Sequence, residues 1–225
     1  MSLHVYPQIE QRSDAWYDQR RGMVTASAVG QLLTGTLRVA DNDSSRGLTA
    51  MLVAERISGW TEDTWMSADM RRGVEHEPYA VEAYEQRTGS KVETCGFMAL
   101  EGDGWTLGYS PDGLVDDDGL IEIKCPRAKT HLQTVIRDAV PDYYMAQCQA
   151  GLLVSGRQWI DWVSFVGGLP LFIKRVTPVR IWQDALVEAV KAFELNAELL
   201  TSNYRLATQG QPPTDRVPDL DAITF

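Results

Sequence analysis

The sequence predicts an α/β (α+β) fold, in which a mixed central β-sheet is flanked by helices. Helical patterns fill roughly the first ninety residues, and alternating strand patterns begin at about residue 91. A long amphipathic segment then closes the patterned part of the chain near residue 200. Helices and strands in this order are typical of a mixed sheet covered by helices. The 225 residues suit a single domain, 1–225, with an irregular tail over about 207–225.

Helices are expected in the first part of the chain wherever a capping residue precedes a helical pattern. The expected helices cover 13–22, 25–33, 48–58 and 67–87. Ser13 and Ser67 are suited to cap the first and the last of them, and Gly89 is suited to end the last. The segment 34–46 is polar and is expected to be a mobile loop.

Strand patterns dominate the rest of the chain, with helical patterns between them. The expected strands cover 91–100, 105–109, 120–125, 159–166 and 171–178, and Gly167-Gly168 joins the last two as a pair. The expected helices cover 130–137, 142–154 and 181–200. The apolar side of the last helix is expected to consist of Trp182, Ala185, Ala189, Ala192, Phe193 and Leu199.

The net charge of −10 argues on its face against nucleic acid as a partner, because Lys and Arg drive phosphate binding. The charge is not uniform along the sequence, however. Basic residues gather at Arg20-Arg21, at Arg71-Arg72 and over 124–129. An acidic protein can still bind DNA when such positive charge lines one groove or channel, so this class of partner stays open.

No stretch of the sequence is long and apolar enough to span a membrane, and the first residues lack the pattern of a secretory signal. The three cysteines are an odd number without C-x-x-C spacing, which argues against a disulfide framework and against a zinc site. We therefore expect Cys95, Cys125 and Cys148 to be small buried residues in a reducing cytoplasm.

The segment 110–126 contains the acidic and basic residues that best suit an active site. One side of the strand expected at 120–125 is wholly apolar and is expected to face the core. Glu122 and Lys124 therefore lie together on the opposite side. Asp112 precedes a turn rich in Gly and Asp, and a hairpin there would bring its carboxylate next to that of Glu122.

Two converging carboxylates and a lysine are the groups that metal-assisted phosphodiester hydrolysis needs. Mg²⁺ prefers oxygen ligands, polarises a scissile phosphate and lowers the pKa of a bound water. The lysine can position or deprotonate that water, or stabilise charge in the transition state. Spacing alone leaves a simpler interpretation open, in which Glu122 and Lys124 form a surface salt bridge. Asp116-Asp117-Asp118 are expected to be turn residues.

The pattern P-D-G followed by E-x-K resembles the restriction-endonuclease-like, or PD-(D/E)-x-K, nuclease superfamily. Within it the chain looks like the phage lambda exonuclease family, also called the YqaJ-type viral recombinases. The resemblance rests on segments that occur in that family's order over about residues 13–150: Trp16 with Arg20 to Ser27, Gly73 to Glu77, Ser110 to Gly113, Glu122 to Pro126 and Tyr144 to Gln147. It implies a restriction-endonuclease-like core.

The resemblance also implies roles for the matched residues around the predicted hairpin. The ligands of catalytic Mg²⁺ would be Asp112, Glu122, the Ile123 carbonyl and Glu77. Glu77 would hold a second metal ion or a metal-bound water. Lys124 would be the catalytic lysine, and Gln147 would orient groups near it. His76, beside Glu77, is interpreted as structural because no second histidine follows at metal-binding spacing.

A pocket for the 5′-phosphate of a DNA end is implied in the same way, and it would consist of Arg20, Thr25, Ser27 and Ser110, with Tyr144 as a further DNA contact. A helix beginning at Thr25 would favour an anion at its N-terminus, and Arg20 offers a bidentate fork. Without the resemblance, Thr25 or Ser27 is most simply a helix N-cap. The family's phosphate-contacting arginine does not align cleanly, so that role stays open between Arg127 and Lys129.

The activity that the resemblance implies is that of a Mg²⁺-dependent 5′-to-3′ exonuclease, with Mn²⁺ able to substitute. It would digest one strand of linear double-stranded DNA and expose 3′ single strands for recombination by strand annealing. A homotrimeric ring around the DNA, a single-strand annealing protein as partner, and a phage or prophage origin in the bacterial cytoplasm are implied with it. Two alternatives stay open: a restriction-type endonuclease of the same superfamily, and a non-catalytic DNA-binding protein on this fold.

Overall fold

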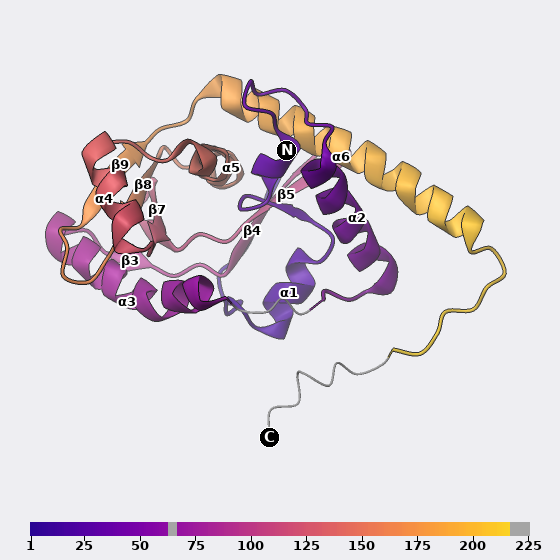
Figure 1. The fold of residues 1–225 in the computed structure, drawn as a ribbon, viewed down its shortest axis with the longest axis horizontal. Helices are drawn as coiled ribbons and strands as arrows, with labels where there is room; N and C mark the ends of the chain where they lie inside the picture. Colours follow the sequence, from indigo (N-terminus) through magenta and orange to yellow (C-terminus); the bar gives the residue numbers. More distant parts are fainter. Residues whose placement is uncertain (63–66, 217–225) are drawn as a thin grey trace.

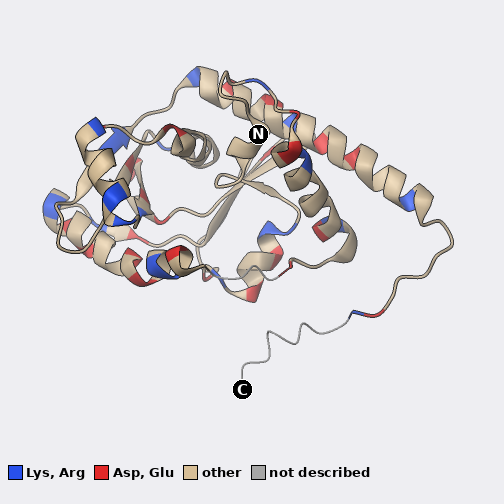
Figure 2. Cartoon of the chain, in the orientation of Figure 1, with Lys and Arg blue, Asp and Glu red and all other residues tan. Residues whose placement is uncertain are grey.

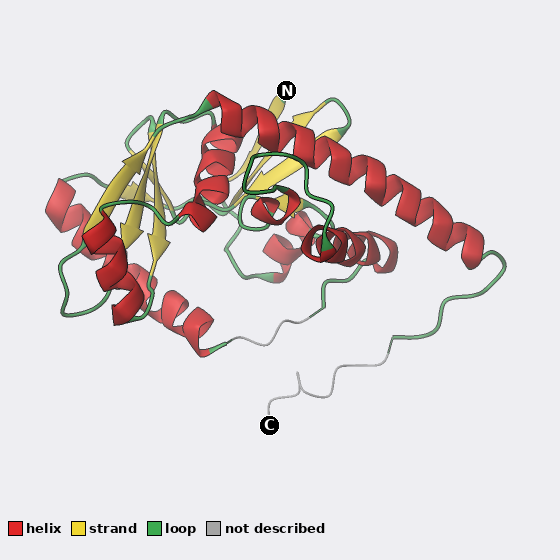
Figure 3. Ribbon diagram, turned by 45° about the horizontal axis from the view of Figure 1, so that its top comes forward, coloured by secondary structure: helices red, strands yellow, loops and turns green. Residues whose placement is uncertain are grey.

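The computed structural model of the chain describes residues 1–62 and 67–216. Two β-sheets and the helices that cover them make up this part of the chain (Figures 1 and 3). The first sheet has the strand order β1-β4-β5-β2, and the second has the order β3-β6-β7-β8-β9. The predicted α/β (α+β) class is confirmed, but two sheets replace the single central sheet that we expected.

The first sheet combines antiparallel and parallel strands. Its strands are β1 (Ser2–Tyr6), β2 (Val24–Thr25), β4 (Phe97–Gly102) and β5 (Trp105–Tyr109). β1 and β5 both pair with β4 in antiparallel fashion, and β2 pairs with β5 in parallel. β1 lies at the edge of this sheet and is mostly exposed, which explains why its short sequence carries no clear strand pattern.

The second sheet carries the predicted active-site hairpin. Its strands are β3 (Val92–Glu93), β6 (Gly113–Val115), β7 (Gly119–Lys124), β8 (Trp159–Ser164) and β9 (Phe172–Val176). β6 and β7 form an antiparallel hairpin, β7 pairs with β8 in parallel, and β8 pairs with β9 in antiparallel fashion. The strand pair predicted over 159–178 is thereby confirmed.

The strand predicted over 91–100 is divided between the two sheets, into β3 and β4. Gly96 lies between them, where an added Cβ atom would come within 1.8 Å of the carbonyl oxygen of Ile9. Only glycine permits so close an approach of two backbones. The chain therefore crosses from one sheet to the other at this residue.

Six α-helices and two 3₁₀ turns lie within the described ranges. They are α1 (Asp14–Arg20), α2 (Asp43–Ser58), α3 (Ala68–Thr88), α4 (Ala128–Arg137), α5 (Met145–Ser155) and α6 (Arg180–Ala207), with η1 (Val29–Leu32) and η2 (Asp142–Tyr144). Ser13 and Ser67 accept the capping hydrogen bonds of α1 and α3, and Gly89 ends α3 with φ 76°, as predicted.

Two helix boundaries differ from the prediction. α2 begins at Asp43 rather than near 48, because Asn42 and Ser45 form a reciprocal capping box that shortens the predicted loop. α6 continues to Ala207 along one side of the molecule (Figure 1), and Leu199 is 64% exposed instead of lying on its apolar side. The segment 208–216 contains no helix or strand, as expected, whereas 217–225 lies outside the described residues.

The helix predicted over 25–33 is wrong. Thr25 belongs to β2, and the next N–H, that of Ala26, donates to the Gly108 carbonyl at 2.7 Å. Only the 3₁₀ turn η1 follows. The local Thr-Ala-Ser pattern suits an N-cap, but pairing with β5, which is distant in sequence, gives these residues their backbone partners instead.

The hydrophobic core covers both faces of the second sheet. A smaller cluster packs α3 against Ile121 and Ile123 on one face of β7, and a larger cluster that includes residues of α2, α5 and α6 reaches Leu120 on the other. The expectation that only the Ile121 side of this strand faces the core is therefore wrong. β7 is an inner strand with a parallel neighbour, and such strands are usually covered on both faces.

The burial of the cysteines and the character of the helices follow from this fold. Cys95 and Cys148 are buried, as expected, whereas Cys125 is only half-buried at the end of β7. None of the helices that the structure describes is long and apolar enough to cross a membrane.

Candidate active site

The β6–β7 hairpin brings Asp112 next to the strand that carries Glu122, as predicted. Asp112 Oδ2 accepts a hydrogen bond from the Ile123 N–H at 2.6 Å. Lys124 Nζ donates to Glu122 Oε1 at 2.6 Å, and Gln147 Nε2 on α5 donates to the same oxygen. We call Asp112, Glu122, Lys124 and Gln147 the acid–lysine cluster. The salt bridge between Glu122 and Lys124 exists, but it is not a surface pair, because Glu122 is only 1% exposed.

Burial sets the electrostatics of the acid–lysine cluster. It raises the pKa of Asp112 well above its usual value, and the neighbouring charge of Glu122 raises that pKa further. Burial alone would lower the pKa of Lys124, but the charges of Glu122 and Asp112 raise it overall. Lys124 is therefore an ammonium cation that partly neutralises two carboxylates in a site of low polarity.

Two tyrosines border the cluster. Tyr109 OH donates to Glu122 Oε2 at 3.4 Å, and the Lys124 ammonium lies 5.1 Å from the ring centroid of Tyr144. Burial first, and then the charge of Glu122, raise the pKa of Tyr109, so this hydroxyl stays protonated as a donor. Tyr109 was not predicted, although its place at the end of β5, just before Ser110, offered a signal.

A cavity of about 610 Å³ lies next to the cluster. Glu77 of α3 lines this cavity together with Asp112, Ile123 and Lys124. Glu77 Oε2 accepts a hydrogen bond from Arg12 Nη2 at 3.0 Å, and no sequence pattern predicts this partner. Arg12, Arg72 of α3 and Arg127, which precedes α4, also line this cavity. Figure 2 shows further Lys and Arg residues along α3 and α4. Of the two open candidates for a phosphate contact, Arg127 lines this cavity, and Lys129 does not.

The donor set of the cluster fits a divalent cation with oxygen ligands. Among residues 1–62 and 67–216, no group of three or more His, Cys, Asp or Glu side chains gathers at a point that could hold an ion. Mg²⁺ needs fewer, because it is usually bound by one or two carboxylates and keeps several waters. Asp112, Glu122 and the Ile123 carbonyl meet that requirement. The raised pKa of Asp112 also reports a repulsion that a divalent cation would relieve.

A second group of predicted residues meets at the end of β5. Arg20 Nη1 and Trp16 Nε1 both donate to Ser110 Oγ at 2.9 Å, and the Arg20 guanidinium carbon lies 3.9 Å from the Trp16 ring centroid. Burial lowers the pKa of Arg20 and outweighs the opposing charges of Tyr17 and Glu55, so that the pKa is about 10. This half-buried guanidinium donates to a neutral hydroxyl and forms no salt bridge within the described part of the chain. Such a cation favours an anionic ligand.

Thr25 and Ser27 lie beside this group because β2 runs parallel to β5. Thr25 pairs with Gly108. Ser27 follows Thr25 by two residues, and Ser110 follows Gly108 by two residues. The hydroxyls of Thr25 and Ser27 are 3.2 Å apart. We call Arg20, Thr25, Ser27 and Ser110 the Arg20 pocket. The expected helix N-terminus at Thr25 is absent, so an anion there would depend on hydroxyl groups and Arg20, not on a helix dipole.

The three aspartates between β6 and β7 are turn residues, as predicted. Asp116 has φ 48°, and the carbonyls of Asp116 and Gly119 accept hydrogen bonds from Arg157 Nη1 at 2.9 and 2.6 Å. Asp118 Oδ1 accepts a hydrogen bond from Trp159 Nε1 at 3.1 Å. This segment therefore shapes the hairpin and lies at the opposite end of β7 from Lys124.

Comparison with known proteins identifies the family of this chain. Residues 15–158 match the model of the YqaJ-like viral recombinase domain. The chain belongs to this family. A search of curated protein sequences gives no match. The resemblance that the motifs implied is therefore confirmed at the level of the family.

Solved structures extend the comparison of this YqaJ-family chain. An alkaline exonuclease from Laribacter hongkongensis is 32% identical, with a TM-score of 0.78 over 87% of this chain and 98% of its own. The same enzyme in complex with dAMP gives 0.77 with the same identity and coverage. A phage-related exonuclease from Haemophilus somnus 129PT is 13% identical, with a TM-score of 0.60 over 81% of this chain and 96% of its own, and is similar in fold alone. The chain is thus an alkaline-exonuclease-like nuclease.

Proposed function

We propose that this nuclease is a Mg²⁺-dependent 5′-to-3′ exonuclease that digests one strand of linear double-stranded DNA. The observation that carries the proposal is the spacing of Ser110 and Asp112, which join the Arg20 pocket to the acid–lysine cluster through one proline. Successive Cα atoms are about 3.8 Å apart, so the two residues lie within about 7.6 Å of each other. A 5′-phosphate bound at Arg20 and Ser110 would place the next phosphodiester bond near Asp112.

Cleavage at that bond would release a single nucleotide. The complex of the Laribacter hongkongensis enzyme with dAMP, a nucleoside monophosphate, supports this product. Thr25 and Ser27 would complete the binding of the 5′-phosphate through their hydroxyls. Tyr144 and Arg127 line the cavity that also contains Asp112 and Lys124, and they would contact the DNA strand that enters it.

The residues of the cluster divide the work of hydrolysis. When bound, Mg²⁺ would polarise the scissile phosphate and make a water nucleophilic near neutral pH, and Mn²⁺, which takes similar ligands, would substitute. Asp112, Glu122 and the Ile123 carbonyl would hold the ion, and Glu77 would hold a second ion across the cavity. Lys124 would stabilise the negative charge that develops on the phosphate. Gln147 fixes the orientation of the Glu122 carboxylate.

The test compares DNA with and without ends. Purified protein with Mg²⁺ is expected to release mononucleotides from the 5′ end of 5′-phosphorylated linear duplex, and to leave closed circular plasmid intact. Cleavage of the closed circle would support the restriction-type endonuclease instead. If neither substrate were cleaved in Mg²⁺ or in Mn²⁺, the non-catalytic alternative would replace the proposal.

We further propose the assembly and setting that the family suggests: a homotrimeric ring around the DNA, a single-strand annealing protein as partner, and a phage or prophage enzyme in the bacterial cytoplasm. The description of the family as viral recombinases supports this setting. The net charge of −10, together with the basic residues that line the cavity, suits a ring with a basic lining. A mass measurement in solution tests the ring, and a strictly monomeric protein would exclude it.

A further inference from the structure

The Arg20 pocket depends on one backbone turn. α1 ends at Arg20, and the Met23 N–H donates to the Arg20 carbonyl at 3.0 Å. Arg21 has φ −55° and ψ 124°, and Gly22 has φ 66°, which are the backbone angles of a type II turn. Such a turn requires a positive φ at its third position, which glycine adopts most readily. Beyond Met23 the chain enters β2, so this turn sets the position of Arg20 relative to Thr25.

Two successive residues of α2 hold both polar groups of Gly22. Glu55 Oε2 accepts a hydrogen bond from the Gly22 N–H at 2.7 Å, and Arg56 Nε donates to the Gly22 carbonyl at 2.6 Å. Glu55 is only 9% exposed, and no salt bridge joins it to a cation in the part of the chain that the structure describes. A buried carboxylate is costly unless it is well hydrogen-bonded, so its contact with the turn accounts for an acidic residue at this position.

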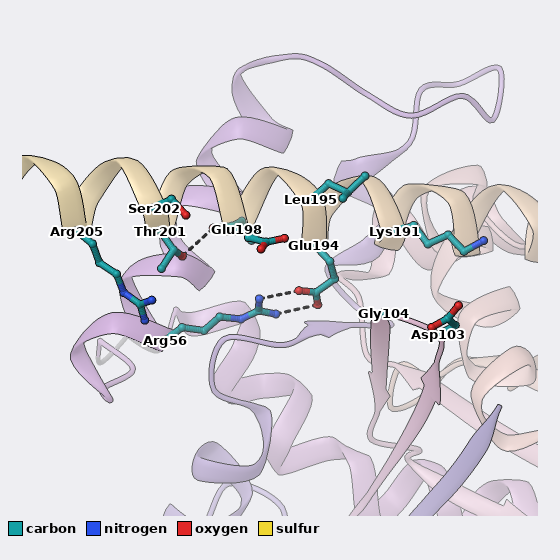
Figure 4. A pocket seen from close by; sticks show the side chains of 11 residues that line it. Arg56, Asp103, Gly104, Lys191, Glu194, Leu195, Glu198, Thr201, Ser202 and Arg205 are labelled. Carbon is teal, nitrogen blue, oxygen red and sulfur yellow. Dashed lines mark hydrogen bonds and ion pairs between the residues drawn. The ribbon is translucent and has the colours of Figure 1, made fainter.

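Arg56 also connects the turn to α6. Its two terminal nitrogens donate to the two carboxylate oxygens of Glu194 at 2.7 and 2.9 Å (Figure 4). Its guanidinium carbon lies 5.2 Å from the ring centroid of Phe193. The guanidinium is thus fixed by a backbone carbonyl, a carboxylate and an aromatic ring. A lysine could not reproduce this planar set of contacts.

We propose that Glu55 and Arg56 are positioning residues for recognition of a 5′-phosphate, and that Glu194 braces Arg56 from α6. This inference rests on the proposed function, which assigns the Arg20 pocket to a DNA end. Loss of either bond to Gly22 would let its peptide groups rotate and move Arg20 relative to Thr25. The acid–lysine cluster lies just before β6 (Asp112), on β7 and on α5, and shares none of these hydrogen bonds.

The experiment measures kcat and KM on linear duplexes that carry either a 5′-phosphate or a 5′-hydroxyl. Arg56→Met is expected to raise KM for the phosphorylated end about tenfold, as expected for loss of a charge-assisted hydrogen bond. Its kcat should stay within about twofold of the wild-type value, and KM for the hydroxyl end should not change. A role in folding alone would affect both ends equally.

The matched control is Arg46→Met. Arg46 also lies on α2 and pairs with Asp41 and Asp43, but its side chain is 59% exposed and does not touch the turn. It should retain the wild-type preference for the phosphorylated end. A folded Arg56→Met variant with that same preference, or with equal losses on both ends, would overturn the proposal.

Two further variants keep the test decisive if Arg56→Met does not fold. Glu55→Gln retains an acceptor for the Gly22 N–H and should keep most of the preference, whereas Glu55→Ala should lose it. Glu194→Gln is expected to raise KM for the phosphorylated end by about two- to fivefold, because it weakens only the brace. Unchanged preference in both Glu55→Ala and Glu194→Gln would also overturn the inference. A wild-type protein that does not distinguish the two ends would instead refute end recognition by the proposed function.

Discussion

The acid–lysine cluster and the Arg20 pocket are separated by a single proline, yet they are assembled in opposite ways. Asp112 and Glu122 come from one hairpin of the second sheet, and the bond from Asp112 to Ile123 spans 11 positions. The bond from Arg20 to Ser110 spans 90 positions and joins α1 to the end of β5 in the first sheet. Hydrolytic chemistry is thus encoded locally, whereas selection of a DNA end depends on long-range packing. Mutations should therefore separate the two.

The largest expected effect comes from the cluster itself. Lys124→Ala should lower kcat by about 10²- to 10³-fold on phosphorylated and hydroxyl ends alike, because it removes a half-buried cation from the site of developing charge. Single-turnover digestion of both substrates measures this loss. Lys191→Ala serves as a control, because Lys191 is an exposed lysine on α6 that pairs with Glu188 and does not line the cavity at the cluster. A loss confined to one kind of end would contradict the division between the two regions.

Metal removal should act on the same region. A chelator is expected to abolish cleavage of every substrate, and Mg²⁺ should restore it. Mg²⁺ at about one hundred times its Kd should also raise the free energy of unfolding by about 2.7 kcal/mol, because only the folded site binds it. Thermal unfolding with and without Mg²⁺ measures this shift. The stabilisation should disappear in Asp112→Asn, and its persistence there would place the ion elsewhere.

The Arg20 pocket should give a smaller and selective effect. Arg20→Ala is expected to raise KM for a 5′-phosphorylated end by about tenfold to a hundredfold, the amount expected for loss of charge-assisted hydrogen bonds to phosphate. Cleavage from a hydroxyl end should hardly change. Arg21→Ala tests the neighbouring arginine, whose side chain pairs with Asp18. Equal effects of the two substitutions would remove the special role of Arg20.

The contrast between the two regions also explains what the sequence could predict. The Asp112–Glu122 arrangement followed from strand alternation and turn residues within a short segment, so local reasoning was sufficient. The burial of Glu122 could not be predicted locally, because one of the residues that contact it is Gln147 of α5, 25 positions away. Thr25 was assigned to a helix because its local pattern suits an N-cap, while its partner strand lies more than eighty positions further on. Arg12 beside Glu77 had no local signal at all.

The smallest expected effect is a pH dependence of stability. The pKa of Asp112 is raised in the folded protein, so the folded state binds this proton more tightly than the unfolded state does. Its contribution to stability is present below the ordinary Asp pKa of about 3.9 and is lost as the pH rises through the folded value. Without metal, the free energy of unfolding of the wild type should therefore fall relative to that of Asp112→Asn over this range. Denaturant titrations at several pH values measure the difference, and parallel curves would show that Asp112 is not perturbed.

The most direct test of the division between chemistry and end recognition is one ratio, kcat/KM on a 5′-phosphorylated duplex over kcat/KM on a 5′-hydroxyl duplex. It should be measured in the wild type, Lys124→Ala and Arg20→Ala. We predict that Lys124→Ala keeps the wild-type ratio while losing rate, and that Arg20→Ala brings the ratio close to one while retaining kcat. A changed ratio in Lys124→Ala, or an equal loss of kcat on both ends in Arg20→Ala, would contradict the account.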